Sequence, residues 1–288
     1  MTTRSFDEVV GVDVRPEKLA SGFVFTEGPV WHPDERCLYF SDIPASITRR
    51  WKPDGTVEIV ASPNGKSNGM TLDLDGKLLI CRHAERRVVK RVSDDRYQTV
   101  ADRFEGKRFN SPNDLVVKSD GSLYFTDPPY GLTKDFGQEG EQELPYQGVF
   151  RMDAARKNLT LLTDAFFRPN GLAFSPDESL LYVNDSEREY VKVFDVDEHG
   201  GLRGERLFAE VHGDAPGCPD GMKVDSEGNV YVTGPGGIWV FNAEAEKLGV
   251  IGVPEVAANL AFGEADMRTL FITASTSLYR TRVSIPGK

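Results

Sequence analysis

The chain repeats one short motif six times, and this repetition constrains its fold more than any other feature of the sequence. Each copy runs from a polar residue through a short apolar segment and an Asp/Gly-type turn into an alternating apolar segment. The six copies are EGPVWHPDERCLYFSDI from Glu27, SNGMTLDLDGKLLICRH from Ser67, SPNDLVVKSDGSLYFTD from Ser111, RPNGLAFSPDESLLYVND from Arg168, CPDGMKVDSEGNVYVTG from Cys218 and AANLAFGEADMRTLFITA from Ala257. Such turns between two segments of period-2 alternation are typical of β-hairpins.

The segments that follow each hairpin predict a four-stranded unit. A third strand-like segment follows all six hairpins, and a fourth follows most of them, as in VEIVAS, YQTVAD, LTLLTD and ERLFAE. Six copies in 288 residues give 288/6 = 48 residues per copy, and propeller blades need roughly 40 to 50. The sequence therefore predicts an all-β chain that folds as one six-bladed β-propeller domain over residues 1–288. An open sandwich of six hairpins is the alternative, but it does not account for the repeat.

The two ends of the chain predict how the ring closes. The last copy stops after its third strand-like segment, near Ser284, whereas a spare strand-like segment from Glu17 to Ser21 precedes the first copy. We expect this N-terminal strand to complete the last blade, so that no open edge is left between the first and last blades.

Charge and apolar patterning limit the partners. With 45 acidic and 34 basic residues the formal charge is −11, which disfavours nucleic acid and anionic membrane surfaces. Apolar runs fall far short of the roughly 20 residues of a membrane span, and the N-terminal segment lacks the apolar core of a signal peptide. We therefore expect a cytoplasmic protein. The three cysteines (Cys37, Cys81 and Cys218) form no CxxC pair, and we interpret them as free thiols.

Aligning the six copies on their turns gives one equivalent polar position in each. These positions form an inner ring around the expected channel, with spacings of 41, 45, 57, 50 and 39 residues, and they hold Glu27, Asn68, Asn113, Asn170, Asp220 and Asn259. Carboxylate and amide oxygens without Cys or His suit a hard cation such as Ca²⁺ or Mg²⁺. The alternative is that the Asn-Gly and Asp-Gly pairs are ordinary turns. Recurrence in six copies favours the cation.

A second tier of polar residues follows the second strand of four copies. Because the strands are antiparallel, Asp42, His83, Asp127 and Asp185 should return to the same face and overlook the inner ring. The insertion from Pro128 to Gly148 lies on that face too, and it is either a lid over a substrate pocket or a tolerated surface loop.

Several motifs in this order resemble the gluconolactonase, senescence-marker-protein and luciferin-regenerating-enzyme family of six-bladed propellers. They are EGPVW (27–31), NSPNDL (110–115), YFTDPPYG (124–131), PNGLAFSPD (169–177) and PDGMKVDSEGNVYV (219–232). The resemblance spans nearly the whole chain, and NSPNDL with DPPYG is similar to the bacterial gluconolactonase branch.

The resemblance implies one divalent metal ion on the channel axis, held by Glu27, Asn170 and Asp220. It also implies that Asn113 lies beside the metal and contacts substrate, and that Asp220 is the acid/base or nucleophilic residue. The substrate-binding arginine of the animal members falls on Ser111 here, so the family's substrate preference does not carry over at this position.

The expected activity is that of a metal-dependent lactonase, a hydrolase of carboxylic esters acting on an aldonolactone such as glucono-1,5-lactone. A divalent ion would polarise the carbonyl and stabilise the oxyanion, and Asp220 would take the proton of the attacking water or attack directly. Ca²⁺ is expected first, with Mg²⁺, Mn²⁺, Zn²⁺ and Fe²⁺ as alternatives. We expect Asp127 and Tyr130 near substrate hydroxyls. His83 is a further candidate at the mouth, although an ordinary loop hydrogen bond is the simpler interpretation of a histidine there.

Two other functions fit the same sequence. One is hydrolysis of phosphotriesters at the same metal. The other is a non-catalytic binding propeller in which the metal only stabilises the structure.

Overall fold

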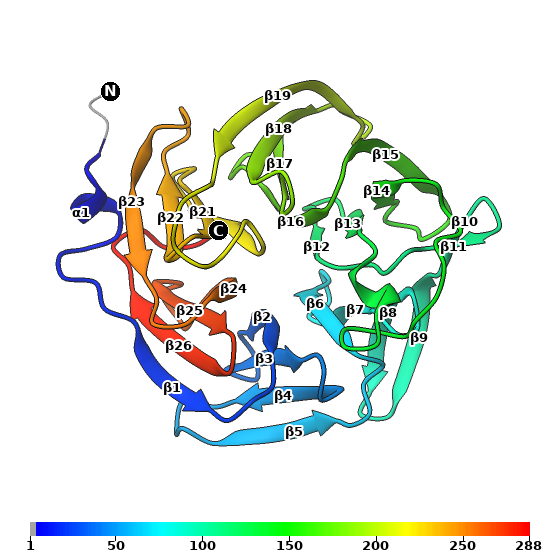
Figure 1. Cartoon of the computed structure of the whole chain (residues 1–288), viewed down its shortest axis with the longest axis horizontal. Helices are drawn as coiled ribbons and strands as arrows, with labels where there is room; N and C mark the ends of the chain where they lie inside the picture. Colours follow the sequence, from blue (N-terminus) through cyan, green and yellow to red (C-terminus); the bar gives the residue numbers. More distant parts are fainter. Residues whose placement is uncertain (1–3) are drawn as a thin grey trace.

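The computed structural model describes residues 4–288, which form six four-stranded antiparallel sheets arranged around a central axis (Figure 1). The predicted six-bladed β-propeller is confirmed. In each blade the first strand lies nearest the axis and the fourth lies at the rim.

The blades follow one another along the chain. Blade one comprises β2 (Thr26–His32), β3 (Cys37–Asp42), β4 (Ile47–Trp51) and β5 (Val57–Ala61), and blade two comprises β6 (Ser67–Leu72), β7 (Leu78–Arg82), β8 (Arg87–Ser93) and β9 (Arg96–Ala101). Blade three comprises β12 (Leu115–Val117), β13 (Leu123–Asp127), β14 (Gln147–Met152) and β15 (Leu159–Phe166), and blade four comprises β16 (Pro169–Phe174), β17 (Leu180–Asp185), β18 (Tyr190–Val196) and β19 (Leu202–Glu210). Blade five comprises β20 (Met222–Val224), β21 (Val230–Gly234), β22 (Gly237–Phe241) and β23 (Lys247–Gly252).

Blade six is completed by the N-terminal strand, as predicted. It comprises β24 (Ala257–Gly263), β25 (Thr269–Ala274), β26 (Ser277–Arg282) and β1 (Glu17–Ser21). Strand β1 pairs antiparallel with β26, with Glu17 opposite Arg280 and Ser21 opposite Ser277. The first and last thirds of the chain therefore share one sheet, and the ring has no open edge between blades six and one.

Some short elements lie outside the repeat. A helical turn, α1 (Phe6–Val9), precedes β1. A two-stranded ribbon, β10 (Arg103–Phe104) and β11 (Lys107–Arg108), links blades two and three, and the 3-10 turn η1 (Tyr130–Leu132) lies in the insertion of blade three. Within residues 4–288 no helix is both long enough and apolar enough to cross a membrane.

Apolar side chains pack between neighbouring blades. The cluster of Leu79 and Cys81 from blade two with Leu123 and Phe125 from blade three is one example. These alternate residues of adjacent sheets face each other, as period-2 strands predict. Cys37 and Cys81 are buried free thiols, whereas Cys218 is partly exposed.

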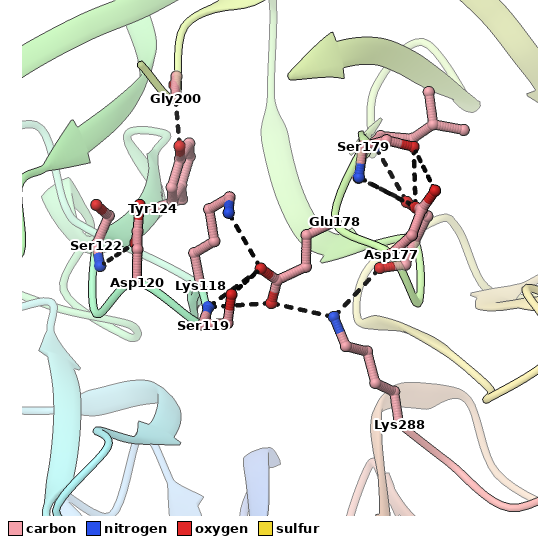
Figure 2. A network of polar contacts seen from close by, with 12 residues as sticks. Lys118, Ser119, Asp120, Ser122, Tyr124, Asp177, Glu178, Ser179, Gly200 and Lys288 are labelled. Atoms are coloured by element: carbon pink, nitrogen blue, oxygen red, sulfur yellow. Dashed lines mark hydrogen bonds and ion pairs between the residues drawn. The ribbon is translucent and has the colours of Figure 1, made fainter. Parts of the chain in front are cut away.

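Polar contacts join the blades at the mouth of the channel opposite the candidate site. Figure 2 shows Glu178, in the hairpin turn of blade four, between Lys118 and Ser119 of blade three and Lys288. The Glu178–Lys118 and Glu178–Lys288 ion pairs are each 3.1 Å long. Burial raises the pKa of Glu178, but the hydrogen bonds from Ser119, Lys288 and Lys118 outweigh it and lower the pKa to about 2. Glu178 thus links three parts of the ring as an anion.

Candidate active site

Glu27, Asn68 and Asn170 lie at irregularities in the innermost strands. The pairing of β2 with β3 shifts register between Glu27 and Val30, and β6 and β16 shift similarly after Ser67 and Pro169. A bulge of this kind re-aims side chains out of the regular pleat. Asn68 and Asn170 therefore lie within strands, and the interpretation of their Asn-Gly pairs as turns is wrong.

The glycines after the inner-ring residues allow neighbouring blades to approach closely. A Cβ on Gly171 would lie 2.2 Å from the carbonyl oxygen of Asp220, and one on Gly221 would lie 2.1 Å from the side chain of Asn259. The Gly171 amide instead donates to the Asp220 carbonyl at 3.0 Å. Gly171 and Gly221 therefore leave space for the neighbouring blade at the axis. The hydrogen bond from the Gly171 amide also joins blade four to the segment that enters blade five.

Most of the inner ring faces one small cavity of about 190 Å³. Its polar lining contains Glu27, Asn68, His83, Asn113, Tyr130, Asn170, Ser186 and Asp220, and its other walls are Phe25, Ile43, Phe136 and Cys218. Larger hollows lie beside the N-terminal arm and at the opposite mouth of the channel, but neither contains an inner-ring residue. The cavity is smaller than the roughly 300–1,000 Å³ typical of drug-sized ligands, so it suits a small substrate.

Three carboxylates lie within electrostatic reach of one another at the axis. Burial, then the charge of Asp114, raises the pKa of Glu27, while the hydrogen bonds from Gly28 and Asn259 oppose this rise. Burial, then the charges of Glu27 and Asp114, raises the pKa of Asp220 well above its usual range. Ionised carboxylates so placed are costly unless a cation compensates them.

Three cavity-lining oxygens have no partner within residues 4–288, namely Asn68 Oδ1, Glu27 Oε1 and Asn170 Oδ1. Glu27 uses Oε2 to accept from the Gly28 amide and from Asn259 Nδ2 (3.0 Å), which leaves its buried Oε1 free. Asn170 donates from Nδ2 to Ser186 Oγ at 3.0 Å, and its buried Oδ1 is free as well. Ser186 in turn donates to the Pro219 carbonyl. A buried polar atom without a partner calls for an explanation, and a hard cation would supply one.

The described residues hold no group of three His, Cys, Asp or Glu side chains with metal-binding geometry. Asp114 Oδ1 accepts from the Leu115 amide at 2.8 Å, and Asp114 does not line the cavity. The set that fits a cation is two carboxylates completed by the amide oxygen of Asn170, which is the set that the family resemblance implies.

Asn113 presents a donor to the cavity. Asn68 Nδ2 donates to Asn113 Oδ1 at 2.6 Å. Within residues 4–288 the side-chain Nδ2 of Asn113 donates no hydrogen bond, so it is available to a substrate oxygen.

His83 lines the cavity, but both of its ring nitrogens are engaged. Nδ1 lies 3.0 Å from the Phe136 carbonyl, and Nε2 lies 3.3 Å from Asn68 Nδ2. Burial lowers the pKa of His83 to about 4. The imidazole is therefore neutral at pH 7, donates to Phe136 and accepts from Asn68. These contacts give it a positioning role and match the simpler of the two interpretations from the sequence.

The expectation for the second tier needs correction. Asp42, Asp127 and Asp185 are fully buried and absent from the cavity lining, because each accepts hydrogen bonds from the loop that enters its inner strand. Asp127 Oδ2 accepts from the Asn110 amide at 2.7 Å, and Asp185 Oδ2 accepts from the Phe167 amide at 2.7 Å. Asp127 thus holds the loop before Asn113 and does not line the cavity. Burial raises its pKa to about 8 despite the backbone hydrogen bonds.

The insertion of blade three forms part of the cavity wall through Tyr130 and Phe136. It is fastened to blade two by His83 and by Lys66, which donates to the Asp135 carbonyl at 2.9 Å. The Phe136 ring also meets that of Phe25 edge-on at 5.5 Å. Burial raises the pKa of Tyr130, which is therefore a neutral phenol at the cavity. The insertion thus forms part of the cavity wall, and its role as a lid stays a prediction.

The sequence reasoning missed two residues of the site, Ser186, which lines the cavity, and Asp114. Asp114 occupies the position after Asn113 where four other copies have glycine (Gly28, Gly69, Gly171 and Gly221). An acidic residue at a position that is glycine in four of the five other copies was the available signal.

Comparison with known proteins identifies relatives along nearly the whole chain. The SMP-30/gluconolactonase/LRE-like region matches residues 25–276. The gluconolactonase of Zymomonas mobilis is 39% identical over 98% of this chain and 85% of its own, and the pentonolactonase XacC of Haloferax volcanii is 30% identical over 86% and 81%. The solved structure of a gluconolactonase from Xanthomonas campestris superposes with a TM-score of 0.91 at 33% identity, covering 98% of this chain and 94% of that one.

Proposed function

The chain belongs to the SMP-30/gluconolactonase/LRE-like family and is a lactone-hydrolysing enzyme, and from this premise we propose that it opens a sugar lactone with the help of one divalent metal ion. The metal would be held in the inner-ring cavity by Glu27, Asn170 and Asp220.

The observation that carries the proposal is the pair of unpartnered oxygens, Glu27 Oε1 and Asn170 Oδ1, beside a carboxylate pair that repels itself. A cation would satisfy both oxygens and remove the repulsion. Because all three donors are hard oxygens, Ca²⁺ is the first choice, with Mg²⁺, Mn²⁺, Zn²⁺ and Fe²⁺ as alternatives.

When bound, the metal would supply Lewis-acid polarisation of the lactone carbonyl and stabilisation of the oxyanion. The protein's own groups do the rest. Asn259 and Ser186 orient the Glu27 carboxylate and the Asn170 amide. The Asp220 carboxylate takes the proton of the attacking water, and direct attack by this carboxylate is the alternative mechanism. The Asn113 amide donates to a substrate oxygen.

We propose an aldonolactone such as glucono-1,5-lactone as substrate, since the full-length relatives include a gluconolactonase and a pentonolactonase by name. The small cavity and its ring of hydroxyl, amide and carboxylate groups suit a compact polyhydroxylated molecule. Asn113 and Tyr130 are the proposed contacts to its hydroxyls. In line with the expectation from the sequence, we propose that the enzyme acts in the cytoplasm.

The test replaces each ligand by its neutral isostere. Glu27→Gln and Asp220→Asn should each reduce hydrolysis of glucono-1,5-lactone to the spontaneous rate and weaken metal binding measured by calorimetry. Asp54→Asn, in an exposed turn of blade one, is the matched control and should behave as wild type. Normal turnover in either ligand variant would overturn the proposal. Fluorophosphate hydrolysis that exceeds lactone hydrolysis would favour the phosphotriesterase alternative.

A further inference from the structure

The residues two positions before the inner ring form a further tier at the mouth of the cavity. They are Phe25, Lys66, Ser111, Arg168, Cys218 and Ala257. Phe25 and Cys218 line the cavity directly. Lys66 and Ser111 bind the insertion that forms part of its wall, because Lys66 Nζ donates to the Asp135 carbonyl and Ser111 Oγ accepts from the Gly131 amide at 2.8 Å. The register therefore places Arg168 at the same mouth, on the side of blade four.

The guanidinium of Arg168 is held in place by aromatic rings alone. Its Cζ lies 5.4 Å from the centre of the Tyr130 ring, which lines the cavity, and 5.4 Å from that of Phe167. Within residues 4–288 the Arg168 side chain forms no hydrogen bond and no ion pair. By contrast, the blade-one arginine Arg49 pairs with Asp42 at 3.0 Å.

The blade-four carboxylate equivalent to Asp42 is already engaged. Asp185 accepts from the backbone amides of Phe167, Glu187 and Arg188. Arg168 is therefore a cation whose guanidinium donors have no partner within residues 4–288, and it lies within cation–π range of two aromatic rings. A planar guanidinium fork matches the geometry of carboxylate, phosphate and sulfonate oxygens.

We propose that Arg168 is a specificity-determining residue that binds an anionic group on the exocyclic end of the lactone, so that the preferred substrates are acidic aldonolactones. This inference rests on the proposed lactonase function. The reacting ester would lie among Glu27, Asn113 and Asp220, and the distal anion would reach the mouth beside Tyr130. An anion at this distance from the carboxylates also avoids their repulsion.

The test compares a charged and a neutral lactone that share one ring. For 6-phosphoglucono-1,5-lactone and glucono-1,5-lactone, kcat/KM is measured with wild type, Arg168→Gln, Arg168→Lys and Arg188→Gln. The ratio of the two values should fall at least about tenfold in Arg168→Gln, and Arg168→Lys should retain part of it. Arg188→Gln is the matched control: its guanidinium also lies over Phe167, at 5.9 Å, but donates to the Ala165 carbonyl at 3.3 Å. A third lactone carries a carboxylate in place of the phosphate group. If Arg168→Gln also lowers kcat/KM for this lactone, the site binds anions in general; if it does not, the site is specific for phosphate.

If the ratio of kcat/KM for the phosphorylated lactone to kcat/KM for the neutral lactone in Arg168→Gln stays within twofold of wild type, the inference is overturned. The lactonase function would be unaffected by that result. If wild type hydrolyses no lactone with any metal, the proposed function fails first, and Arg168 is then judged by binding. In that case calorimetry of the metal-loaded protein should show 6-phosphogluconate binding more tightly than gluconate, with the difference lost in Arg168→Gln. Equal binding of the two acids to wild type would refute the role of Arg168.

Discussion

Lowering the pH should destabilise the fold through His83, and the size of the effect follows from its surroundings. The ring is fully buried, with both nitrogens bonded, and burial lowers its pKa from 6.5 to about 4. The unfolded chain therefore binds a proton below pH 6.5, whereas the folded protein does so only near pH 4. Stability that is fully present above pH 6.5 is lost as the pH falls through this window. At about 1.4 kcal/mol per pKa unit, His83 should remove roughly 2.5 kcal/mol from the free energy of unfolding between pH 7.5 and 4.5.

The assay is urea unfolding of wild type and His83→Gln, both with chelator present, at a series of pH values from 7.5 to 4.5. Asp127 and Glu27, whose pKa values are raised, also titrate in this range, so the quantity of interest is the difference between the two proteins. Glutamine takes up no proton here, and a constant difference due to lost packing does not depend on pH. The difference should shrink by roughly 2.5 kcal/mol towards pH 4.5. A difference that stays constant with pH would refute the neutral, buried assignment of His83.

Three further predictions concern the ring itself. Ser186→Ala should weaken metal binding by roughly tenfold in calorimetry, because Asn170 loses the acceptor that fixes its amide; unchanged affinity would show that Ser186 does not orient the ligand. Asp114→Asn should raise the melting temperature of the chelated protein by removing repulsion, and it should lower metal affinity; a lower melting temperature would contradict this. Gly221→Ala should cost roughly 1–3 kcal/mol or more in urea unfolding through contact with Asn259, whereas Gly252→Ala, with no atom within 4 Å of the new Cβ, should be tolerated.

The blades were predictable because the hairpin repeat fixes both period and register. Counting from each turn located Glu27, Asn170 and Asp220 in one cavity although 193 residues (220 − 27) separate the first from the last. The fourth strand of blade five, β23, was not identified, because KLGVIG contains two glycines and weak alternation. The ribbon of β10 and β11 is too short, at two residues per strand, to give a periodic signal.

Side-chain direction at strand ends was not predictable from the pattern. Asp127 and Asp185 end their strands where expected, but buried loop amides must find acceptors, and these carboxylates turn towards them. Bulges in the inner strands have the opposite effect and aim Glu27 and Asn170 at the axis. Neither the loop hydrogen bonds nor the bulges change the alternation of apolar and polar residues, so the sequence pattern does not predict them.

The most direct test of the account is lactone hydrolysis by protein stripped of metal with a chelator and then resupplied with one divalent metal at a time. Acid release from glucono-1,5-lactone, corrected for spontaneous opening, reports turnover, and circular dichroism reports folding. The account predicts turnover at the spontaneous rate in the stripped protein and its recovery with one metal ion per chain. Full turnover without metal, or none with any metal in folded protein, would contradict it.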